Sequence, residues 1–363
     1  MKALLKKMVK LLFVCVFIVY SVGQIEAGSD VSEPKRNEAF EFEPIIRQIL
    51  DGYQSFYRLE NFAISTFEFE ADDVPYLGID VSVDMTLTCH PKEMPYFKGM
   101  EMAMENGGLG ITDRLEAQRQ IEKRAKEIIE ECYLVTDRST FKYAIKKEDL
   151  NSKELSKLSA YYCRVDASAP ILYRADSTNT PEDKKMEMFN SGYNMVLQKI
   201  KTVDVIRADV NYDRLAARDW ARNNAFEPQE YPSETIKDGT DCANFVSKAL
   251  NAGGIPEDHS GKWFRAATWG GWAGDNWFRT GHNGNGGVVP YMTGKGYFYH
   301  EADETKVNAG CIMYWLNPKK SHVALVTFGD SVTIKYTEHG ARPSLDTVYI
   351  PANDNAAFYK FLE

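Results

Sequence analysis

Residues 239–247 read Gly-Thr-Asp-Cys-Ala-Asn-Phe-Val-Ser, and this stretch predicts a helix that carries a cysteine in its first turn. Thr240 and Asp241 are residue types that commonly cap helix N-termini, and the glycine pair at 253–254, followed by Pro256, predicts where the helix ends. The dipole and the N–H groups at a helix start favour the thiolate form of Cys242. The same N–H groups are suited to stabilise the oxyanion of a tetrahedral intermediate. The stretch therefore predicts a nucleophilic cysteine.

A histidine lies in the second informative stretch, which reads Ser-His-Val-Ala-Leu-Val-Thr at residues 321–327. Its alternation predicts a strand, and Gly-Asp-Ser at 329–331 predicts a turn into a returning strand. With a two-residue turn, at 330–331 or at 329–330, His339 shares a face with His322, whereas a three-residue turn would bring Glu338 there instead. We therefore expect His339 to orient the His322 imidazole, with Glu338 as the second candidate.

Several separated blocks together resemble the bacterial putative amidase domain, a family related to the NlpC/P60 and CHAP cysteine peptidases. They read Tyr-Asp-Arg-Leu-Ala-Ala-Arg-Asp-Trp-Ala at 212–221, Asp-Cys-Ala-Asn-Phe-Val-Ser-Lys-Ala-Leu at 241–250, Ala-Gly-Gly-Ile-Pro at 252–256, and the histidine stretch at 321–327. The resemblance covers about residues 211–355. It implies a papain-like core with a cysteine–histidine pair and a third polar residue, which are here Cys242, His322 and His339. The chain departs from many relatives in having Gly310-Cys311 where they have Gly-Asp.

The N-terminus has the features of an export signal. Four lysines within the first ten residues precede an apolar run at 11–22, and small residues up to Ala27 offer a cleavage site. An uncleaved membrane anchor is the alternative, but the apolar run is short for a membrane span. We therefore expect a signal peptide at 1–27, no stable membrane span after cleavage, and a protein that is secreted or held in the cell envelope.

The net charge of the chain limits the classes of molecule that it is expected to bind. Its formal net charge is −9 at pH 7, which argues against nucleic acid and anionic membranes. Peptidoglycan or a peptide remains the expected substrate, although an acidic surface gives no electrostatic attraction to a polyanionic cell wall. The sequence does not indicate an oligomeric state.

Periodicity in the rest of the chain predicts an α+β protein with two domains. A polar linker at 28–40 precedes an α+β accessory domain at 41–201, and the cysteine amidase domain follows at 202–363. Within the accessory domain, the patterns predict helices over about 43–57 and 113–132, a strand over 79–88, strand broken by Pro170 over 159–173, and a helix opening at Thr180-Pro181. The amidase domain is expected to have the papain-like, NlpC/P60-like fold.

The number of cysteines is consistent with one nucleophilic cysteine and four cysteines that are buried as small apolar residues. Five of the six cysteines lie beyond residue 27, and an odd number leaves at least one free thiol in an exported chain. The other four are expected to be buried, with a Cys89–Cys163 disulfide as an open alternative. The sequence has neither a CxxC pair nor an HExxH motif, so no metal and no cofactor are predicted.

Four of the six tryptophans cluster in a glycine-rich stretch that follows the cysteine helix. Aromatic side chains on such a loop are suited to stack against a peptide or a sugar, although packing of the loop onto the domain is the alternative. The predicted substrate-binding residues are these tryptophans and two polar residues beside the cysteine: Trp263, Trp269, Trp272, Trp277, Asp241 and Asn244.

These features predict an exported cysteine amidase or peptidase that forms a thioester on Cys242 and then hydrolyses it. His322 would accept the thiol proton and later protonate the leaving amine. Two alternatives stay open: a binding or regulatory module with weak hydrolysis, which the Gly310-Cys311 departure keeps in view, and an acyltransferase that passes the same thioester to another acceptor. The sequence does not indicate which amide bond is cut.

Overall fold

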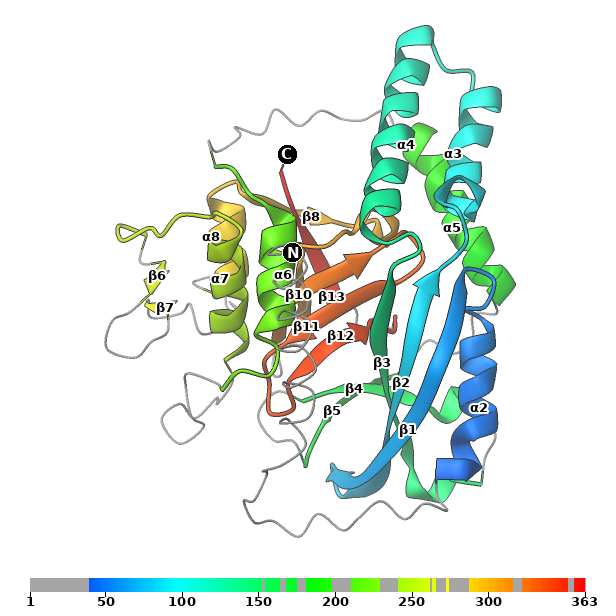
Figure 1. Ribbon diagram of the computed structural model, residues 1–363, viewed down its shortest axis with the longest axis vertical. Helices are drawn as coiled ribbons and strands as arrows, with labels where there is room; N and C mark the ends of the chain where they lie inside the picture. Colours follow the sequence, from blue (N-terminus) through cyan, green and yellow to red (C-terminus); the bar gives the residue numbers. More distant parts are fainter. Residues whose placement is uncertain are drawn as a thin grey trace, which may run out of the picture. The chain divides into compact units, whose positions relative to one another are not determined.

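The computed structural model of the chain describes residues 39–151, 154–163, 168–174, 181–197, 210–228, 241–261, 263–265, 272–273, 287–315, 322–351 and 356–362 (Figure 1). Residues 36–363 form one compact unit. The predicted signal peptide and all but the last two residues of the predicted linker lie outside the described residues, so both stay predictions. No helix of the described residues is long and apolar enough to cross a membrane.

Seven α-helices and thirteen β-strands make up the described chain, together with four short 3-10 segments. The helices are α2 (Ala39–Asp51), α3 (Pro95–Asn106), α4 (Ile111–Glu131), α5 (Pro181–Leu197), α6 (Arg214–Asn223), α7 (Cys242–Ala252) and α8 (Val288–Gly294). The first strands are β1 (Tyr57–Ala71), β2 (Val74–Leu87), β3 (Thr136–Lys146), β4 (Ser159–Tyr162), β5 (Ile171–Arg174), β6 (Phe264–Arg265) and β7 (Trp272–Ala273). The others are β8 (Phe298–Glu301), β9 (Ile312–Trp315), β10 (His322–Gly329), β11 (Ile334–Glu338), β12 (Ser344–Val348) and β13 (Ala356–Phe361).

Local sequence patterns explain where several of these elements lie. The strict alternation around residues 79–87 becomes β2, whose apolar side chains are buried. The strand pattern around Pro170 is divided into the antiparallel pair β4 and β5. Helix α5 begins at Pro181, where a missing N–H costs nothing. The predicted mixture of helices and strands is confirmed, and the structure is a mixed α/β protein with one large sheet.

Eleven strands form that sheet, and they come from both halves of the chain. Its main path runs β1-β2-β3-β12-β11-β10-β9-β13-β8, while β4 and β5 attach to β3. The strands pair antiparallel except where β3 meets β12, a parallel contact at Thr140 and Thr347. The strands before residue 202 and those after it therefore belong to one continuous sheet.

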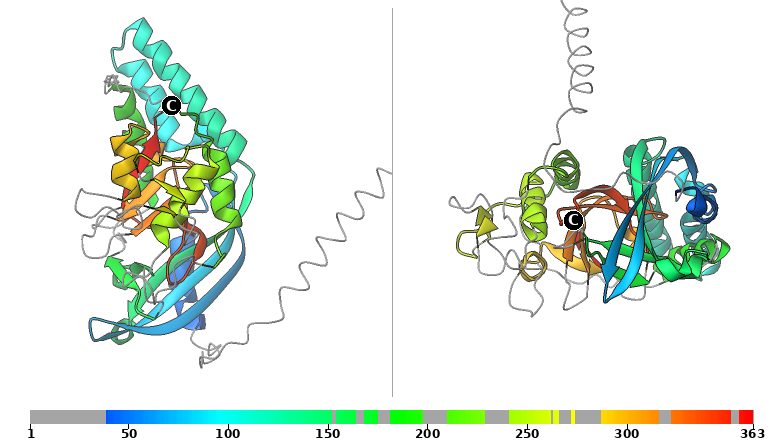
Figure 2. Two further views of the ribbon diagram at one scale, coloured as in Figure 1. Left: turned by 90° about the vertical axis from the view of Figure 1, so that its left-hand side faces the viewer. Right: turned by 90° about the horizontal axis from the view of Figure 1, so that it is seen from below.

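The two faces of strands β9 and β10 are covered by different parts of the chain. Val323 and Leu325 belong to a core cluster shared with α6, α7 and α8. The alternate residues Ala324 and Val326 belong to a larger cluster shared with α2, α3, α4 and strands β1 to β3. Figure 1 and Figure 2 show α6 and α7 beside the strands on the side away from α2. The C-terminal strands are thus buried between their own helices and the N-terminal half.

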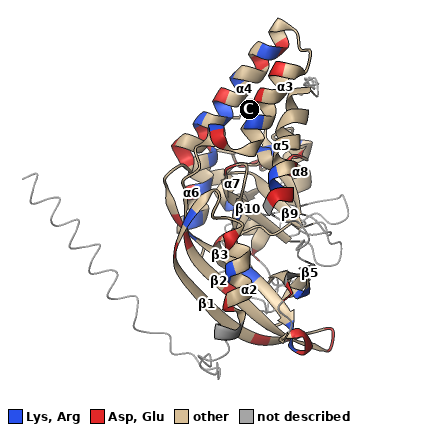
Figure 3. Ribbon diagram, turned by 90° about the vertical axis from the view of Figure 1, so that its right-hand side faces the viewer, with Lys and Arg blue, Asp and Glu red and all other residues tan. Residues whose placement is uncertain are grey.

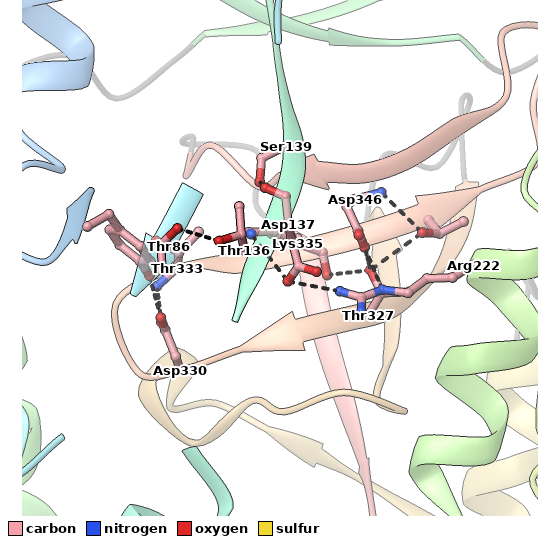
Figure 4. Close-up of polar contacts among 12 residues, drawn as sticks. Thr86, Thr136, Asp137, Ser139, Arg222, Thr327, Asp330, Thr333, Lys335 and Asp346 are labelled. Atoms are coloured by element: carbon pink, nitrogen blue, oxygen red, sulfur yellow. Dashed lines mark hydrogen bonds and ion pairs between the residues drawn. The ribbon is translucent and has the colours of Figure 1, made fainter. Parts of the chain in front are cut away.

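A buried polar network also joins the two halves (Figure 4). The Arg222 guanidinium of α6 donates to Asp346 at 3.1 Å and to Asp137 at 3.4 Å. Lys335 lies 3.9 Å from the Asp137 carboxylate, and the Thr327 hydroxyl donates to Asp346 at 2.6 Å. Because Asp137 lies in β3 whereas the other four residues follow residue 202, this network links the segments through paired charges.

Arg124 of α4 makes a second polar connection between the halves. Its guanidinium is buried and donates to the carbonyls of Val307 at 2.9 Å and Gly329 at 3.1 Å. The Tyr57 hydroxyl donates to the buried carboxylate of Asp330. The predicted boundary near residue 202 is not tested by these contacts and stays a prediction, but the segments on either side share a sheet, a core and buried ion pairs.

The solvent face of the N-terminal half carries both signs of charge. Figure 3 shows Lys and Arg beside Asp and Glu along α4. Two of these neighbours are close enough for ion pairs, Arg119 with Glu116 at 3.4 Å and Lys126 with Glu130 at 3.7 Å. Such exposed pairs contribute little to stability.

Candidate active site

Cys242 is the first residue of α7, as the sequence predicts. The Asp241 residue before it is the N-cap, but its side chain makes no capping hydrogen bond to the helix backbone. The Asp241 carbonyl accepts the Phe245 N–H at 2.8 Å, which begins the helical hydrogen-bond pattern. The N–H groups of the first turn have no partner within a helix, so they and the dipole favour negative charge at Cys242.

His322 is the first residue of β10 and lies beside Cys242. Its Nε2 is 2.6 Å from a carboxylate oxygen of Glu338, and neither side chain is exposed to solvent. Burial alone would lower the pKa of His322, but the charge of Cys242 and its hydrogen-bonding contact, with those of Glu338, raise this pKa to about 9. The pair is therefore suited to a thiolate next to an imidazolium.

The two ring nitrogens of His322 have different roles. A carboxylate can only accept, so Nε2 carries a proton toward Glu338. Because Glu338 binds Nε2, Nδ1 is the nitrogen left for the contact with Cys242. This arrangement fixes the tautomer that can take a proton from sulfur.

Glu338 is held by three partners, two of which bind its other oxygen. Lys142 and the Ser344 hydroxyl each donate to Oε1 at 2.9 Å, while His322 occupies Oε2. Burial alone would raise the pKa of Glu338, but the Lys142 ammonium and the His322 ring outweigh it and lower this pKa to about 2. Glu338 is therefore a carboxylate over the whole range in which the site could work.

The prediction that His339 orients His322 is wrong, and the cause is the strand register. The turn contains four residues, since Gly329 pairs with Ile334, and the Asp330 carboxylate accepts the N–H groups of Val332 and Thr333. This register alone would favour His339. An irregularity between Val326 and Phe328 then shifts the pairing by one residue. Because a shift by one exchanges the two faces, Glu338, the second candidate, lies against His322.

His339 instead lies on the side of α7. Its Nδ1 is 2.8 Å from the Asp241 carboxylate, and its Nε2 is 3.0 Å from the Asn224 carbonyl. The ring stacks on Phe245, with 4.2 Å between centroids. His339 thus fixes the residue that directly precedes Cys242, and it does not contact the His322 ring through a hydrogen bond.

Three of the predicted substrate-binding residues are used inside the protein. The Asn244 amide donates to Asp241 at 2.6 Å, and both residues are 1% exposed. Trp263 has no exposed surface, donates its indole N–H to Ser247 at 3.1 Å and stacks on Tyr291. These placements correct the assignment of Asp241, Asn244 and Trp263 to a substrate surface, because hydrogen bonds around the buried helix α7 hold all three in the core.

The other predicted aromatic contacts are not decided by the structure. Trp269 and Trp277 lie outside the described residues. Trp272 pairs through its backbone with Arg265 in the short β6–β7 ladder. Their contribution to substrate binding stays a prediction.

The remaining cysteines differ chemically from Cys242. None of the five described cysteines forms a disulfide, so the alternative of a Cys89–Cys163 disulfide is wrong. Burial raises the pKa of the Cys89, Cys132 and Cys311 thiols, and it raises that of Cys163 to about 12. Cys311, at the position where many relatives have aspartate, donates to Asn308 at 3.3 Å in the core. Within the described ranges, no group of three or more His, Cys, Asp or Glu is placed to hold a metal ion.

Sequence reasoning missed two residues of this site, both from the N-terminal half. Lys142 of β3 binds Glu338, and the Tyr162 ring of β4 stacks on the His322 ring with 5.3 Å between centroids. The only signal in the sequence is the charge of Lys142, which lies within a strand segment, 139–145, that is otherwise mostly buried. Without the sheet order, that pattern does not identify the carboxylate that the lysine meets.

Comparison with known protein families agrees with the position of this site. Residues 211–361 match the family model described as a putative amidase domain, so this segment is similar to that family. The family indicates an amidase-like, hydrolytic function. No match was found among curated proteins, and none among solved structures.

Proposed function

We propose that the protein is an exported cysteine amidase or peptidase whose C-terminal part has a papain-like fold. The observation that carries the proposal is the contact of Cys242, at the start of α7, with His322, whose other ring nitrogen binds Glu338. The order of the residues along the chain, and a cysteine helix packed on antiparallel strands, support the papain-like architecture. The predicted signal at 1–27 supports export and, with the amidase family, supports peptidoglycan or a peptide as the substrate.

The chemistry follows from these groups. The Cys242 thiolate attacks the carbonyl carbon of an amide, and the N–H groups at the start of α7 stabilise the oxyanion. His322 then protonates the leaving amine as the C–N bond breaks, which leaves a thioester on Cys242. Water attacks the thioester with His322 as the base, and a carboxylate and the free thiol are released. Glu338 keeps the imidazole in the required orientation and tautomer.

The reacting pair is shielded from bulk water, since Cys242 is 1% exposed and His322 has no exposed surface. Exclusion of water strengthens the interactions among the charged groups of the site.

Product analysis tests the proposal directly. Peptidoglycan and defined peptides are incubated with the purified protein and with the Cys242→Ala variant, and mass spectrometry identifies the fragments. We expect a new amine and a new carboxylate at one kind of amide bond, with the active protein only. Transfer of the acyl group to an added amine would indicate an acyltransferase, and binding without products would indicate a binding module.

A labelling experiment tests the predicted state of the thiol. At pH 6.5, we expect iodoacetamide to modify Cys242 before the other four described cysteines, because only Cys242 has a facing imidazole that favours the thiolate, whereas burial raises the pKa of the others. Peptide mass spectrometry measures the rate at each site. Cys89, the one described cysteine that is not buried, is the internal control for access. Labelling of Cys242 no faster than that of Cys311, which is equally exposed at 1%, would contradict the thiolate–imidazolium pair.

The pKa of His322 predicts the alkaline limit of turnover. Below about 9 the ring is protonated and can donate to the leaving amine, and above about 9 that proton is lost. We therefore expect kcat/KM to fall as pH rises through about 9, whereas Glu338, with a pKa near 2, adds no limb above pH 4. A pH–rate profile between 5 and 10 measures this. A fall near the ordinary histidine pKa of 6.5 would contradict the assignment.

A further inference from the structure

We infer that Lys142 is a positioning residue of the proposed active site, which acts on His322 through Glu338. The inference rests on the proposed function and extends it, since Lys142 belongs to β3 and lies outside the segment 211–361 that matches the amidase family. It makes the site composite: the N-terminal half supplies a charge on which the reacting pair depends.

The geometry supports a direct role for this lysine. Its Nζ is 2.9 Å from Oε1 of Glu338, and the two side chains are 6% and 0% exposed. The same carboxylate holds Nε2 of His322 at 2.6 Å through its second oxygen. Lys142, Glu338 and His322 therefore form a continuous buried chain that ends at Cys242, with charges that alternate in sign from the ammonium to the thiolate.

Removal of the ammonium would change the protonation of the chain. A buried carboxylate is costly unless cations or hydrogen bonds compensate it. Without Lys142, the Glu338 carboxylate would lose the charge that does most to offset its burial. His322 would then be the cation left beside the buried carboxylate, and loss of a nearby positive charge favours the protonated ring, so His322 would keep its proton to higher pH.

The other titratable groups near Glu338 do not replace the lysine. Tyr173 of β5, Tyr336 of β11 and Cys163 after β4 are buried. Burial raises the pKa of each, so all three stay neutral over the pH range in which His322 loses its proton. The Ser344 hydroxyl of β12 donates a hydrogen bond but carries no charge. On the other side of His322, Cys242 supplies the thiolate. Among the described groups that bind Glu338 directly, Lys142 and His322 are thus the two that carry a positive charge.

A second contact shows that this half of the chain reaches the imidazole. The Tyr162 ring stacks on His322 with an interplanar angle of 17°, and it also lies 5.0 Å from the Trp315 ring. His322 is therefore enclosed by the N-terminal half on one side and by Cys242 on another. The Lys142–Glu338 ion pair is therefore part of a packed surface around the imidazole and is not isolated.

The test follows the protonation of His322 itself and needs no substrate. The full chain is labelled with ¹⁵N-histidine, and NMR spectra of the imidazole nitrogens are recorded against pH, with the His322 signals identified by their loss in His322→Gln. We expect His322 in the unchanged protein to stay protonated to about pH 9. In Lys142→Met, the midpoint should rise by about one pH unit or more, because the carboxylate then faces the imidazolium as its remaining cation.

Lys335→Met is the matched control. Lys335 is a lysine of the same sheet, 1% exposed, and it lies near Asp137 rather than Glu338 (Figure 4). Its loss should leave the His322 midpoint unchanged, although it removes a buried charge in the same way. An equal shift in both variants would show a general effect of core damage and would overturn the inference.

A double variant keeps the test decisive if Lys142→Met does not fold. Lys142→Met with Glu338→Gln removes both charges, which leaves no unpaired ion in the core. If the lysine acts through Glu338, the midpoint of the double variant should coincide with that of Glu338→Gln alone, and any further shift of the midpoint would overturn the inference. A midpoint near 6.5 in the unchanged protein would instead refute the proposed cysteine–histidine pair. A high midpoint that Lys142→Met does not alter would refute only the role of the lysine.

Discussion

Replacement of Cys242 by alanine is expected to lower amide hydrolysis by at least about 10³-fold, because removal of a nucleophile leaves only substrate binding and oxyanion stabilisation. The fold should be kept. Cys242 is small and lies at the helix start, so loss of its sulfur costs about 1 kcal/mol of stability. Turnover of the cleaved substrate and a urea unfolding curve measure the two effects separately.

Cys311→Ala is the matched control for this prediction. Cys311 and Cys242 are each 1% exposed, so both substitutions remove a buried sulfur of the same size. Cys311 donates to Asn308 and is not placed to attack a substrate. Activity should survive in Cys311→Ala at a similar loss of stability. Full activity in Cys242→Ala would refute the thioester mechanism.

Local sequence signals located the reacting pair well. A capping pattern followed by apolar residues at helical spacing places Cys242 at the first position of α7, and alternation places His322 at the first position of β10. Both signals act over only a few residues, so they do not depend on the rest of the fold. This is why the cysteine and the histidine could be predicted without knowledge of the sheet.

The third residue could not be predicted, because its position depends on the parity of a hairpin. Asp330 closes a four-residue turn with its own carboxylate, and an irregularity near Thr327 then moves the register by one. The four-residue turn alone would keep His339 on the face of His322, and the irregularity alone reverses the choice to Glu338 without a strong local signal in the sequence. The Thr327 hydroxyl of β10 donates to Asp346 of β12, which lies beyond β11 in the sheet, so a tertiary contact stabilises the irregularity.

Contacts between distant parts of the chain account for the other differences. Lys142 and Glu338 are 196 residues apart in sequence and meet because β3 continues the sheet of the C-terminal half. Trp263 was assigned to a substrate surface on the basis of its loop composition, but Ser247 of α7 accepts its indole N–H in the core. Periodicity identifies which face of an element is apolar, and it does not identify the partner that covers the face.

Glu338 and His339 are expected to differ sharply when each is replaced. Glu338→Gln should lower turnover by about 10²-fold or more, since an orienting carboxylate sets the tautomer and charge of the catalytic imidazole. The amide preserves the size of the side chain at a fully buried position, so the loss should lie mainly in kcat. Measurement of kcat and KM, beside the unfolding free energy, separates catalysis from stability.

His339→Ala should instead lower the stability of the protein more than its turnover. It leaves the buried Asp241 carboxylate without its partner at 2.8 Å, which costs about 1–3 kcal/mol of stability. Turnover should fall less than in Glu338→Gln, because His339 reaches the site only by fixing the residue before Cys242. A crippling His339→Ala together with a silent Glu338→Gln would mean that the irregularity near Thr327 is absent from the working enzyme. The hairpin would then keep the register of its four-residue turn, and the residue behind His322 would be a second imidazole that holds no fixed negative charge against it.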